Sequence, residues 1–211
     1  SAEIPGLAER ECEYIQSAEA LESWRGGAEG AAWWTPGSAG VSTPVTLSVR
    51  YDDAGRLDWV REIGPGTPEG ERLARQVEQS LTGERQPASG VRLRFTPGAA
   101  PRVLPGIVCD PALPEGESFL TPGQYRIDFS QIPPSSQRYH FTVQVDVTPD
   151  GQPRDARLTR TSSGLAPIEA QLLEAARRHR YLPALHDGFP VAGVFEYQVR
   201  ARVRGAATRG G

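Results

Sequence analysis

Two serines, a histidine and an aspartate have the residue types that nucleophilic catalysis uses. Ser162 or Ser163 could supply the hydroxyl, with His186 as the base and Asp187 as the group that orients the imidazole. However, no strained Gly-x-Ser-x-Gly turn frames either serine. A hydrolase built around Ser163 and His186 therefore stays an alternative for contrast, and we expect no catalytic residue in this chain.

The three histidines are the first place to look for a metal site. Such a site needs two or more histidines at helical or hairpin spacing, with an acidic or cysteine partner. His140 opens a predicted strand, His179 lies among arginines, and His186 sits in a predicted turn. We therefore expect solvated or turn histidines, and we expect neither a metal nor a cofactor.

The chain contains two cysteines, Cys12 and Cys109, far apart and without metal-ligand spacing. They suit one disulfide in an oxidising compartment or two free buried thiols, and both readings stay open. The chain contains no Met, so we expect a processed N-terminus, produced by signal-peptide cleavage or by simple Met removal. No apolar run of transmembrane length is present in the sequence.

Arginines and tryptophans are the side chains best suited to binding a partner. Arg200, Arg202 and Arg204 alternate, so they fall on one face of the last predicted strand. They form either a solvated face or a docking surface for an acidic partner or anionic lipid head groups. Trp33 and Trp34 either pack in the core or, if extended, leave one ring outward as an anchor for a partner or a membrane interface.

The composition indicates a globular protein with long ordered loops. The chain has 211 residues, of which 38% are hydrophobic, and it contains 23 Gly and 19 Pro. The formal net charge is −3, so the chain has no overall attraction for nucleic acid.

Hydrophobic periodicity locates the elements of the first half. Leu7 to Trp24 has the spacing of an amphipathic helix. Alternating residues then predict strands at 45–51, 57–63 and 91–95, with a helix beginning near Pro68 between the second and third. Residues 96–136 are rich in Pro and Gly but contain apolar islands, so we expect an ordered arm lying along a surface.

The last segment has the clearest pattern. Phe141 to Val147 alternates, Pro149-Asp150-Gly151 makes a turn, and Arg154 to Thr161 returns as a second strand. A helix follows from about Pro167 to Arg180, and Val191 to Val203 closes the segment as a long strand. The order predicts one helix packed on an antiparallel sheet, with Val143, Val145, Leu172 and Leu173 in one core.

These motifs, in this order, resemble the C-terminal domain of TonB-family proteins over about residues 139–204. The features that carry the resemblance are Phe-x-Val-x-Val-x-Val, Pro-Asp-Gly, Ser-Ser-Gly before a helix, Tyr-Leu-Pro-Ala, Gly-Phe-Pro-Val and a closing alternating strand. The resemblance implies a small β-β-α-β domain outside the cytoplasmic membrane that binds proteins by adding a strand to a sheet edge. It also implies that Ser162-Ser163-Gly164 is a turn into the helix.

The first half is similar to this segment. A shift of 96 positions places Val45 on Phe141, Gly55 on Gly151 and Val77 on Leu173, which predicts a degenerate second copy at about residues 43–96. We therefore expect an α+β fold of two small sandwiches, each a sheet with one packed helix. The expected divisions are an N-terminal helix and Trp-containing arm (1–42), the two copies (43–96 and 139–204), a Pro/Gly-rich connector (97–138) and a tail (205–211).

The sequence thus predicts a non-catalytic binding or scaffolding subunit in the periplasm, peripheral to a membrane. Its expected partners are subunits of a respiratory, photosynthetic or transport complex. The alternative is a TonB-like periplasmic adaptor that engages outer-membrane receptors with a separate anchor. Energy transduction by this polypeptide alone is not expected, because the given sequence contains neither a membrane-spanning helix nor a long Pro-rich spacer.

Overall fold

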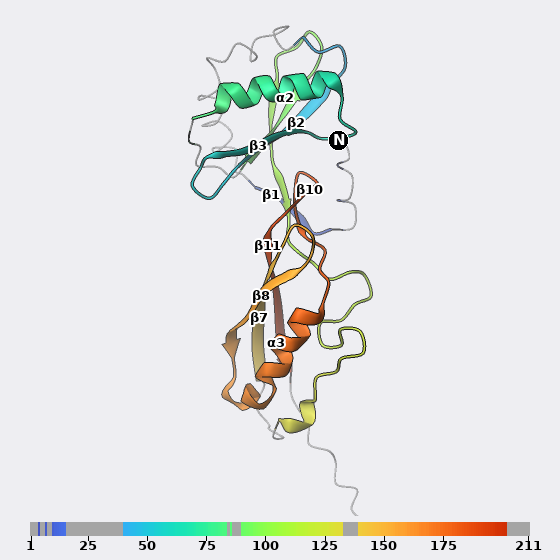
Figure 1. Cartoon of the computed structure of the whole chain (residues 1–211), viewed down its shortest axis with the longest axis vertical. Helices are drawn as coiled ribbons and strands as arrows, with labels where there is room; N and C mark the ends of the chain where they lie inside the picture. The colour runs from blue at the N-terminus through green and yellow to red at the C-terminus, as the bar shows by residue number, and fades with distance from the viewer. Residues whose placement is uncertain are drawn as a thin grey trace, which may run out of the picture. The chain divides into compact units, whose positions relative to one another are not determined.

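The computed structural model of this chain describes residues 4, 7, 10–15, 40–83, 85, 90–132 and 139–201 (Figure 1). The described residues form an α+β fold of antiparallel sheets and helices. The chain divides into two compact units. The first comprises the chain up to Cys109 together with His186–Phe189, and the second comprises Asp110–Leu185 and the chain from Pro190.

The described elements are β1 (Cys12–Tyr14), β2 (Val45–Tyr51), β3 (Leu57–Glu62), α2 (Pro68–Leu81), β4 (Gly90–Phe95), β5 (Arg102–Pro105), β6 (Ile107–Cys109), η2 (Phe129–Gln131), β7 (Tyr139–Val147), β8 (Pro153–Thr161), η3 (Ser163–Ile168), α3 (Glu169–Arg178), β9 (Ala184–His186), β10 (Phe189–Val191) and β11 (Gly193–Ala201). Three sheets are formed, with strand orders β3-β2-β4-β5, β11-β7-β8 and β1-β6-β9-β10.

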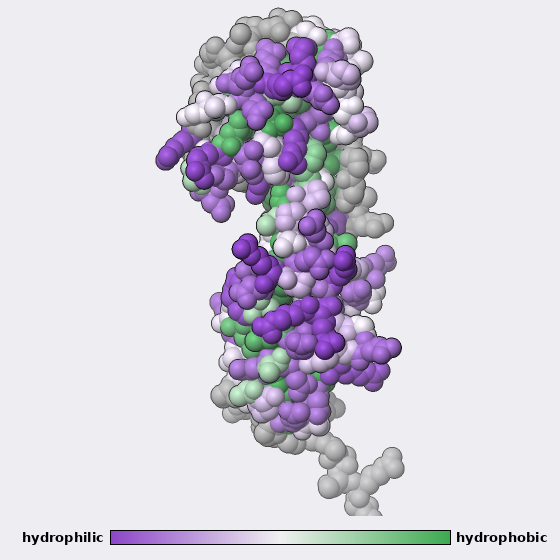
Figure 2. Space-filling model, in the orientation of Figure 1, coloured by the Kyte–Doolittle hydropathy of each residue, from purple (hydrophilic) through white to green (hydrophobic). Residues whose placement is uncertain are grey.

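In the first unit, α2 packs against one face of the sheet β3-β2-β4-β5. Strand alternation places Leu47, Val49 and Leu93 on that face, where all three are fully buried. Leu73 and Val77 are spaced one helical turn apart and complete the core from the helix side. Figure 2 shows hydrophilic side chains over the outward face of α2. The opposite face of the sheet, which we call the open face of the first unit, carries the polar residues of the same strands.

The sequence specifies the beginning of α2 through its capping residues. The Thr67 hydroxyl accepts a hydrogen bond from the Gly70 amide at 2.9 Å, and Pro68 occupies the start of the helix, where its missing N–H costs nothing. The Thr67 amide in turn donates to the Glu62 carboxylate at 2.6 Å, which fixes the entry from β3. The helix predicted to begin near Pro68 is therefore found there.

The second unit has the predicted β-β-α-β order, with α3 packed on the sheet β11-β7-β8. Val143, Val145 and Leu172 are fully buried in its core, and the partly buried Leu173 packs against them. The helix occupies Glu169–Arg178, inside the predicted range, because η3 forms the turn that precedes it. The opposite face of this sheet, the open face of the second unit, carries polar and charged residues.

The hairpins of the two units have the same register. Tyr51 pairs with Leu57 after a bulge in β3, and Val147 pairs with Pro153 after a bulge in β8. Corresponding members of the two pairs lie 96 positions apart. The backbone bonds that close the two turns also correspond: Asp52 N to Arg56 O at 2.8 Å, and Thr148 N to Gln152 O at 2.9 Å.

The two units differ in length before their closing strands. Phe95 of β4 lies opposite Val45, and Val199 of β11 lies opposite Phe141. Val45 and Phe141 are 96 positions apart, whereas Phe95 and Val199 are 104 apart, so the second segment carries eight additional residues. The hairpin of β9 and β10 accounts for this number of residues.

The predicted helix over Leu7–Trp24 is wrong in its first half. Residues Cys12–Tyr14 form β1, which pairs with β6 so that Cys12 lies opposite Cys109 and Tyr14 opposite Ile107. Pairing with a distant strand outweighs a helical periodicity that only local propensity supports. Except for residues 7, 10, 11 and 15, the rest of the predicted helix lies outside the described residues.

The predicted connector contains strands and core residues. Its islands Val103-Leu104 and Ile107-Val108 lie in β5 and β6, within the first unit. Farther along, Phe119, Ile127 and Ile132 are buried in the core of the second unit. The expected arm therefore divides between the two units after Cys109, because its apolar side chains complete their cores.

Candidate functional site

The structure does not bring the predicted Ser-His-Asp group together. His186 and Asp187 belong to the first unit, whereas Ser162 belongs to the second. The side chain of Ser163 is outside the part of the chain that the structure describes. Each half of the predicted group instead has partners in its own unit.

Asp187 is held by the open face of the first unit. One carboxylate oxygen accepts a hydrogen bond from the Ser48 hydroxyl at 2.7 Å, and the other accepts one from the Ile107 amide at 2.8 Å. Arg92 lies beside it, with Nε 3.8 Å from the carboxylate. Asp187 has φ of 50°, the left-handed region that Asp and Asn tolerate better than most residues. The turn at residues 186–188 was predicted, but its burial was not.

His186 packs beside this carboxylate. Its ring meets the Trp59 indole edge to face at 5.8 Å, and Nε2 lies 3.4 Å from the Asp187 carboxylate. Close approach to β4 requires glycine at position 90, since a Cβ there would lie 2.7 Å from the imidazole. His186 and Asp187 are 2% and 1% exposed and Ser48 is 0% exposed, so the cluster is buried. The cluster instead anchors residues 186–189 in the first unit.

Burial shifts the titration of both residues in opposite directions. Burial, aided by the Arg50 guanidinium, lowers the pKa of His186 from 6.5 to about 4. Burial also raises the pKa of Asp187 from 3.8 to about 6, although the Ser48 and Ile107 hydrogen bonds and Arg92 act against it. Neutral His186 thus contributes stability that is lost as pH falls from 6.5 toward 4. Protonated Asp187 contributes stability that is lost as pH rises from 3.8 toward 6.

The opposite pKa shifts of His186 and Asp187 predict opposite pH dependences of stability. Removing one of the two groups by substitution leaves the pH dependence due to the other. Relative to wild type, Asp187→Asn should gain up to about 3 kcal/mol of unfolding free energy as pH rises from 4 to 6. His186→Gln should gain a similar amount relative to wild type as pH falls from 6.5 to 4. Urea titrations at intervals across pH 4–7 measure both, and the difference from wild type removes the other titrating groups. Differences that stay constant with pH would contradict the two shifts.

The prediction of solvated histidines is also wrong for His179. Its ring is 3% exposed and stacks on Phe119 with centroids 5.5 Å apart, and Nε2 is 3.0 Å from the Phe119 carbonyl oxygen. The segment that supplies Phe119 was predicted to be a connector, so the sequence offered no partner for this histidine. His140, by contrast, is exposed, as expected.

Ser162 pairs with His140 across the ends of β7 and β8. Its hydroxyl oxygen is 2.9 Å from His140 Nδ1 and accepts the His140 amide at 3.0 Å. The Ser162 amide donates to the His140 carbonyl at 3.0 Å, so main chain and side chain together close this end of the hairpin. The arrangement places an exposed imidazole at a fixed position on the open face of the second unit.

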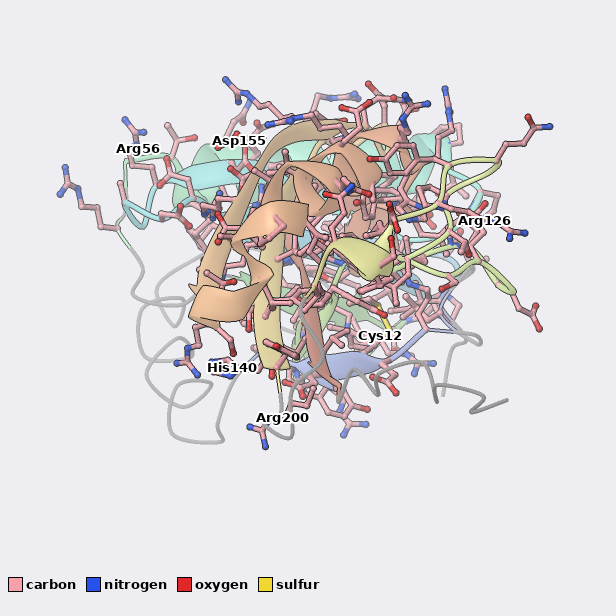
Figure 3. The ribbon with its side chains drawn as sticks, turned by 90° about the horizontal axis from the view of Figure 1, so that it is seen from below. Cys12, Arg56, Arg126, His140, Asp155 and Arg200 are labelled. Atoms are coloured by element: carbon pink, nitrogen blue, oxygen red, sulfur yellow. A yellow bond between two sulfur atoms is a disulfide. The ribbon has the colours of Figure 1, made fainter. Side chains whose placement is uncertain are left out.

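A basic hollow of about 360 Å³ lies beside this imidazole. Its lining residues come from all three strands of the sheet: Tyr139, His140, Phe141 and Thr142 of β7, Arg160 of β8, and Gln198, Val199 and Arg200 of β11. Strand pairing sets Arg200 opposite His140 and Arg160 opposite Thr142, so these side chains share the open face. Figure 3 labels His140 and Arg200, which lie at the same end of the paired strands. We call this the basic hollow.

The basic hollow is suited to a negatively charged group. Arg160 and Arg200 are exposed, and neither forms an ion pair with any carboxylate of the described residues. The nearby Glu196 is held by the amides of Gln144 and Gln198, hydrogen bonds that lower its pKa, with a smaller contribution from Arg160. Two guanidinium groups and an imidazole can therefore donate hydrogen bonds to a carboxylate or phosphate. Of the three predicted arginines, Arg200 lines the hollow, while Arg202 and Arg204 lie outside the described residues, as do Trp33 and Trp34.

Cys12 and Cys109 form a disulfide, with their Cα atoms 4.2 Å apart (Figure 3). It joins β1 to β6, whose pairing sets the two cysteines opposite each other. Within the described part of the chain, no cluster of three or more His, Cys, Asp or Glu residues could hold a metal ion. None of the described helices combines the length and the hydropathy needed to cross a membrane.

No protein-family model, curated protein or solved structure matches this chain.

Proposed function

We propose that this protein is a non-catalytic extracytoplasmic subunit that docks on a membrane protein assembly and helps to hold it together. The observation that carries the proposal is the basic hollow, in which Arg160 and Arg200 lie exposed beside His140 without a carboxylate partner among the described residues. Exposed arginines of this kind steer an acidic partner and orient it on the surface. The proposed partner surface is therefore acidic.

The edges of the second sheet support the same proposal. Among the described strands, the order β11-β7-β8 leaves the outer edges of β8 and β11 without a partner in that sheet. The resemblance of residues 139–204 to the TonB C-terminal domain implies binding by strand addition at such an edge. Backbone pairing would then supply affinity, and the adjacent arginines would select the partner.

The disulfide supports a location outside the cytoplasm. Such bonds persist in oxidising compartments, of which the bacterial periplasm is one. The protein would be peripheral to the membrane there, held by protein contacts. In the alternative, the same face engages outer-membrane receptors as a TonB-like adaptor.

The proposal predicts that two substitutions weaken docking on membranes. Purified full-length protein is mixed with salt-washed membranes from the cells that produce it, and the sedimented fraction is measured against concentration. Arg160→Gln with Arg200→Gln should weaken binding by about tenfold, because charge-assisted hydrogen bonds are lost. The variant should also show a flatter dependence on salt. Binding equal to wild type at every salt concentration would contradict the proposal.

Two controls are needed. The first tests whether the effect depends on the position of the removed charge, and the second tests whether the binding partner is a protein or a lipid. Arg177→Gln removes one arginine charge from α3, which packs on the other face of the sheet, and should leave binding unchanged, whereas Arg160→Gln or Arg200→Gln alone should weaken it. Membranes treated with protease should lose binding, whereas vesicles made from their extracted lipids should not restore it. Equal binding to those vesicles would assign the hollow to lipid head groups instead of a protein assembly.

A further inference from the structure

The open face of the first unit already binds one side-chain carboxylate of this chain, that of Asp187. Ser48 of β2 and Arg92 of β4 are directly paired across the sheet, and together they face the Asp187 carboxylate. Ser48 donates a hydrogen bond to it at 2.7 Å, while Arg92 supplies the compensating charge at 3.8 Å. We call this hydroxyl opposite an arginine the recognition unit; at Asp187 the Ile107 amide adds one further hydrogen bond.

The same recognition unit recurs two residues farther along the two strands. Thr46 of β2 lies opposite Arg94 of β4. Because side chains alternate with a period of two, this pair shares the face of Ser48 and Arg92. Arg102 of β5 lies opposite Arg94 on its other side and adds a second guanidinium. The first unit therefore contains a second row, of one hydroxyl and two arginines, across three strands.

This second row lacks the carboxylate that the first row has. Arg92 faces Asp187, and Arg50 forms an ion pair with Asp58. By contrast, neither Arg94 nor Arg102 forms an ion pair with a carboxylate in the part of the chain that the structure describes. Like charges directly opposite each other in a sheet are destabilising. Such a pair, half-buried at Arg94 and exposed at Arg102, is consistent with a site whose anion comes from another molecule.

We infer that Thr46, Arg94 and Arg102 bind a carboxylate from an acidic segment of a partner protein. The neighbouring row, Ser48 and Arg92, binds the side-chain carboxylate of Asp187 with a hydroxyl and a guanidinium. This favours an aspartate or glutamate side chain over a phosphate as the ligand of the second row. Two residues along a strand span about 7 Å, the repeat of an extended peptide whose alternate side chains point the same way. An acidic strand lying across the open face would place one carboxylate in this row. The site is separate from the basic hollow and does not rest on it.

Binding of an acidic peptide tests this inference. The probe is a fluorescein-labelled octapeptide of alternating aspartate and serine, and its affinity is measured by fluorescence anisotropy. The starting protein is the full chain carrying Arg160→Gln and Arg200→Gln, so that the hollow of the second unit does not contribute. Adding Arg94→Gln and Arg102→Gln should weaken binding by at least about tenfold. Thr46→Val should weaken it by about threefold, since one neutral donor is lost.

Matched controls make a negative result informative. Arg75→Gln removes one arginine charge from α2, which packs on the other face of this sheet, and should leave peptide binding unchanged, whereas Arg94→Gln alone should weaken it. The Arg94/Arg102 variant should keep the thermal midpoint of its parent or raise it, because a like-charge pair is removed. Peptide affinity that is insensitive to Arg94 and Arg102 would overturn the inference. So would binding of inorganic phosphate or anionic vesicles through these arginines without binding of the peptide.

Discussion

Replacing both Cys12 and Cys109 by serine is expected to lower the free energy of unfolding by about 4.7 kcal/mol. The disulfide closes a loop of 97 residues, so its loss frees a large part of the first unit in the unfolded chain. In the chain-entropy account, a longer loop gives a larger effect, and this loop is near the upper end. Urea unfolding of the double variant, followed by circular dichroism, measures the loss directly.

Reduction of the wild-type disulfide provides an independent control for this prediction. A phosphine reductant should lower the unfolding free energy of wild type to that of the double serine variant and leave the variant unaffected. The position of β1 gives a second readout, because the pairing of Cys12–Tyr14 with β6 should lose amide-exchange protection. A decrease in unfolding free energy below about 1 kcal/mol would contradict the prediction. It would show that other contacts keep the loop closed in the unfolded, reduced chain.

Replacing Asp187 by alanine is expected to destabilise the protein by about 3–5 kcal/mol. The substitution leaves the Ser48 hydroxyl and the Ile107 amide without their acceptor, and it leaves Arg92 without its nearest carboxylate. Unpaired groups of this kind carry their full desolvation cost when buried. Alanine is also unfavourable at φ of 50°.

Asparagine at position 187 is the matched control. It keeps an acceptor oxygen and the left-handed backbone preference, so Asp187→Asn should cost no more than about 1–2 kcal/mol at neutral pH. Chemical denaturation of both variants at pH 7 gives the comparison. Equal losses for the two variants would show that the charge of Asp187 matters more than its hydrogen bonds.

Local pattern predicted the elements whose partners are close in the sequence. Alternation located β2 and β7, and helical periodicity located α2 and α3, because each of these elements buries one regular face. The turn at Pro149-Asp150-Gly151 located β8 after it. The similarity of the two hairpins was visible in the sequence because Gly55 and Gly151 both have positive φ, of 73° and 77°, in corresponding turns. Register within a hairpin follows from its turn, so this part of the fold was readable from the sequence.

The elements that were predicted incorrectly are those whose structure depends on contacts with residues distant in the sequence. The helical spacing around Cys12 gave no sign that these residues pair with β6, since nothing local marks a strand whose partner lies 97 residues away. The turn at His186-Asp187 was predicted correctly, but an exposed turn and a turn buried against a sheet distant in the sequence have the same local sequence. The available signal was the length difference: the second segment has eight residues more than the first, the length of the β9–β10 hairpin that contains this turn.

The candidate site was predictable only in part. Alternation identified Arg200 as an outward arginine, and the strand that carries it is present. Its neighbours across the sheet, Arg160 and His140, depend on the register of β7 with both β8 and β11, including the bulges in β8. Bulges have no reliable sequence signature, so the convergence of these three side chains could not be read from spacing alone.

Purification of the tagged full-length protein from gently solubilised membranes, with mass spectrometry of what accompanies it, tests the proposed function most directly. We expect membrane protein subunits in fixed stoichiometry with the wild-type protein, and their loss from the Arg160/Arg200 variant but not from Arg177→Gln. Outer-membrane receptors in their place would favour the adaptor alternative. Recovery of the protein without any membrane protein, or equal recovery of the same subunits with the Arg160/Arg200 variant, would contradict docking through the basic hollow.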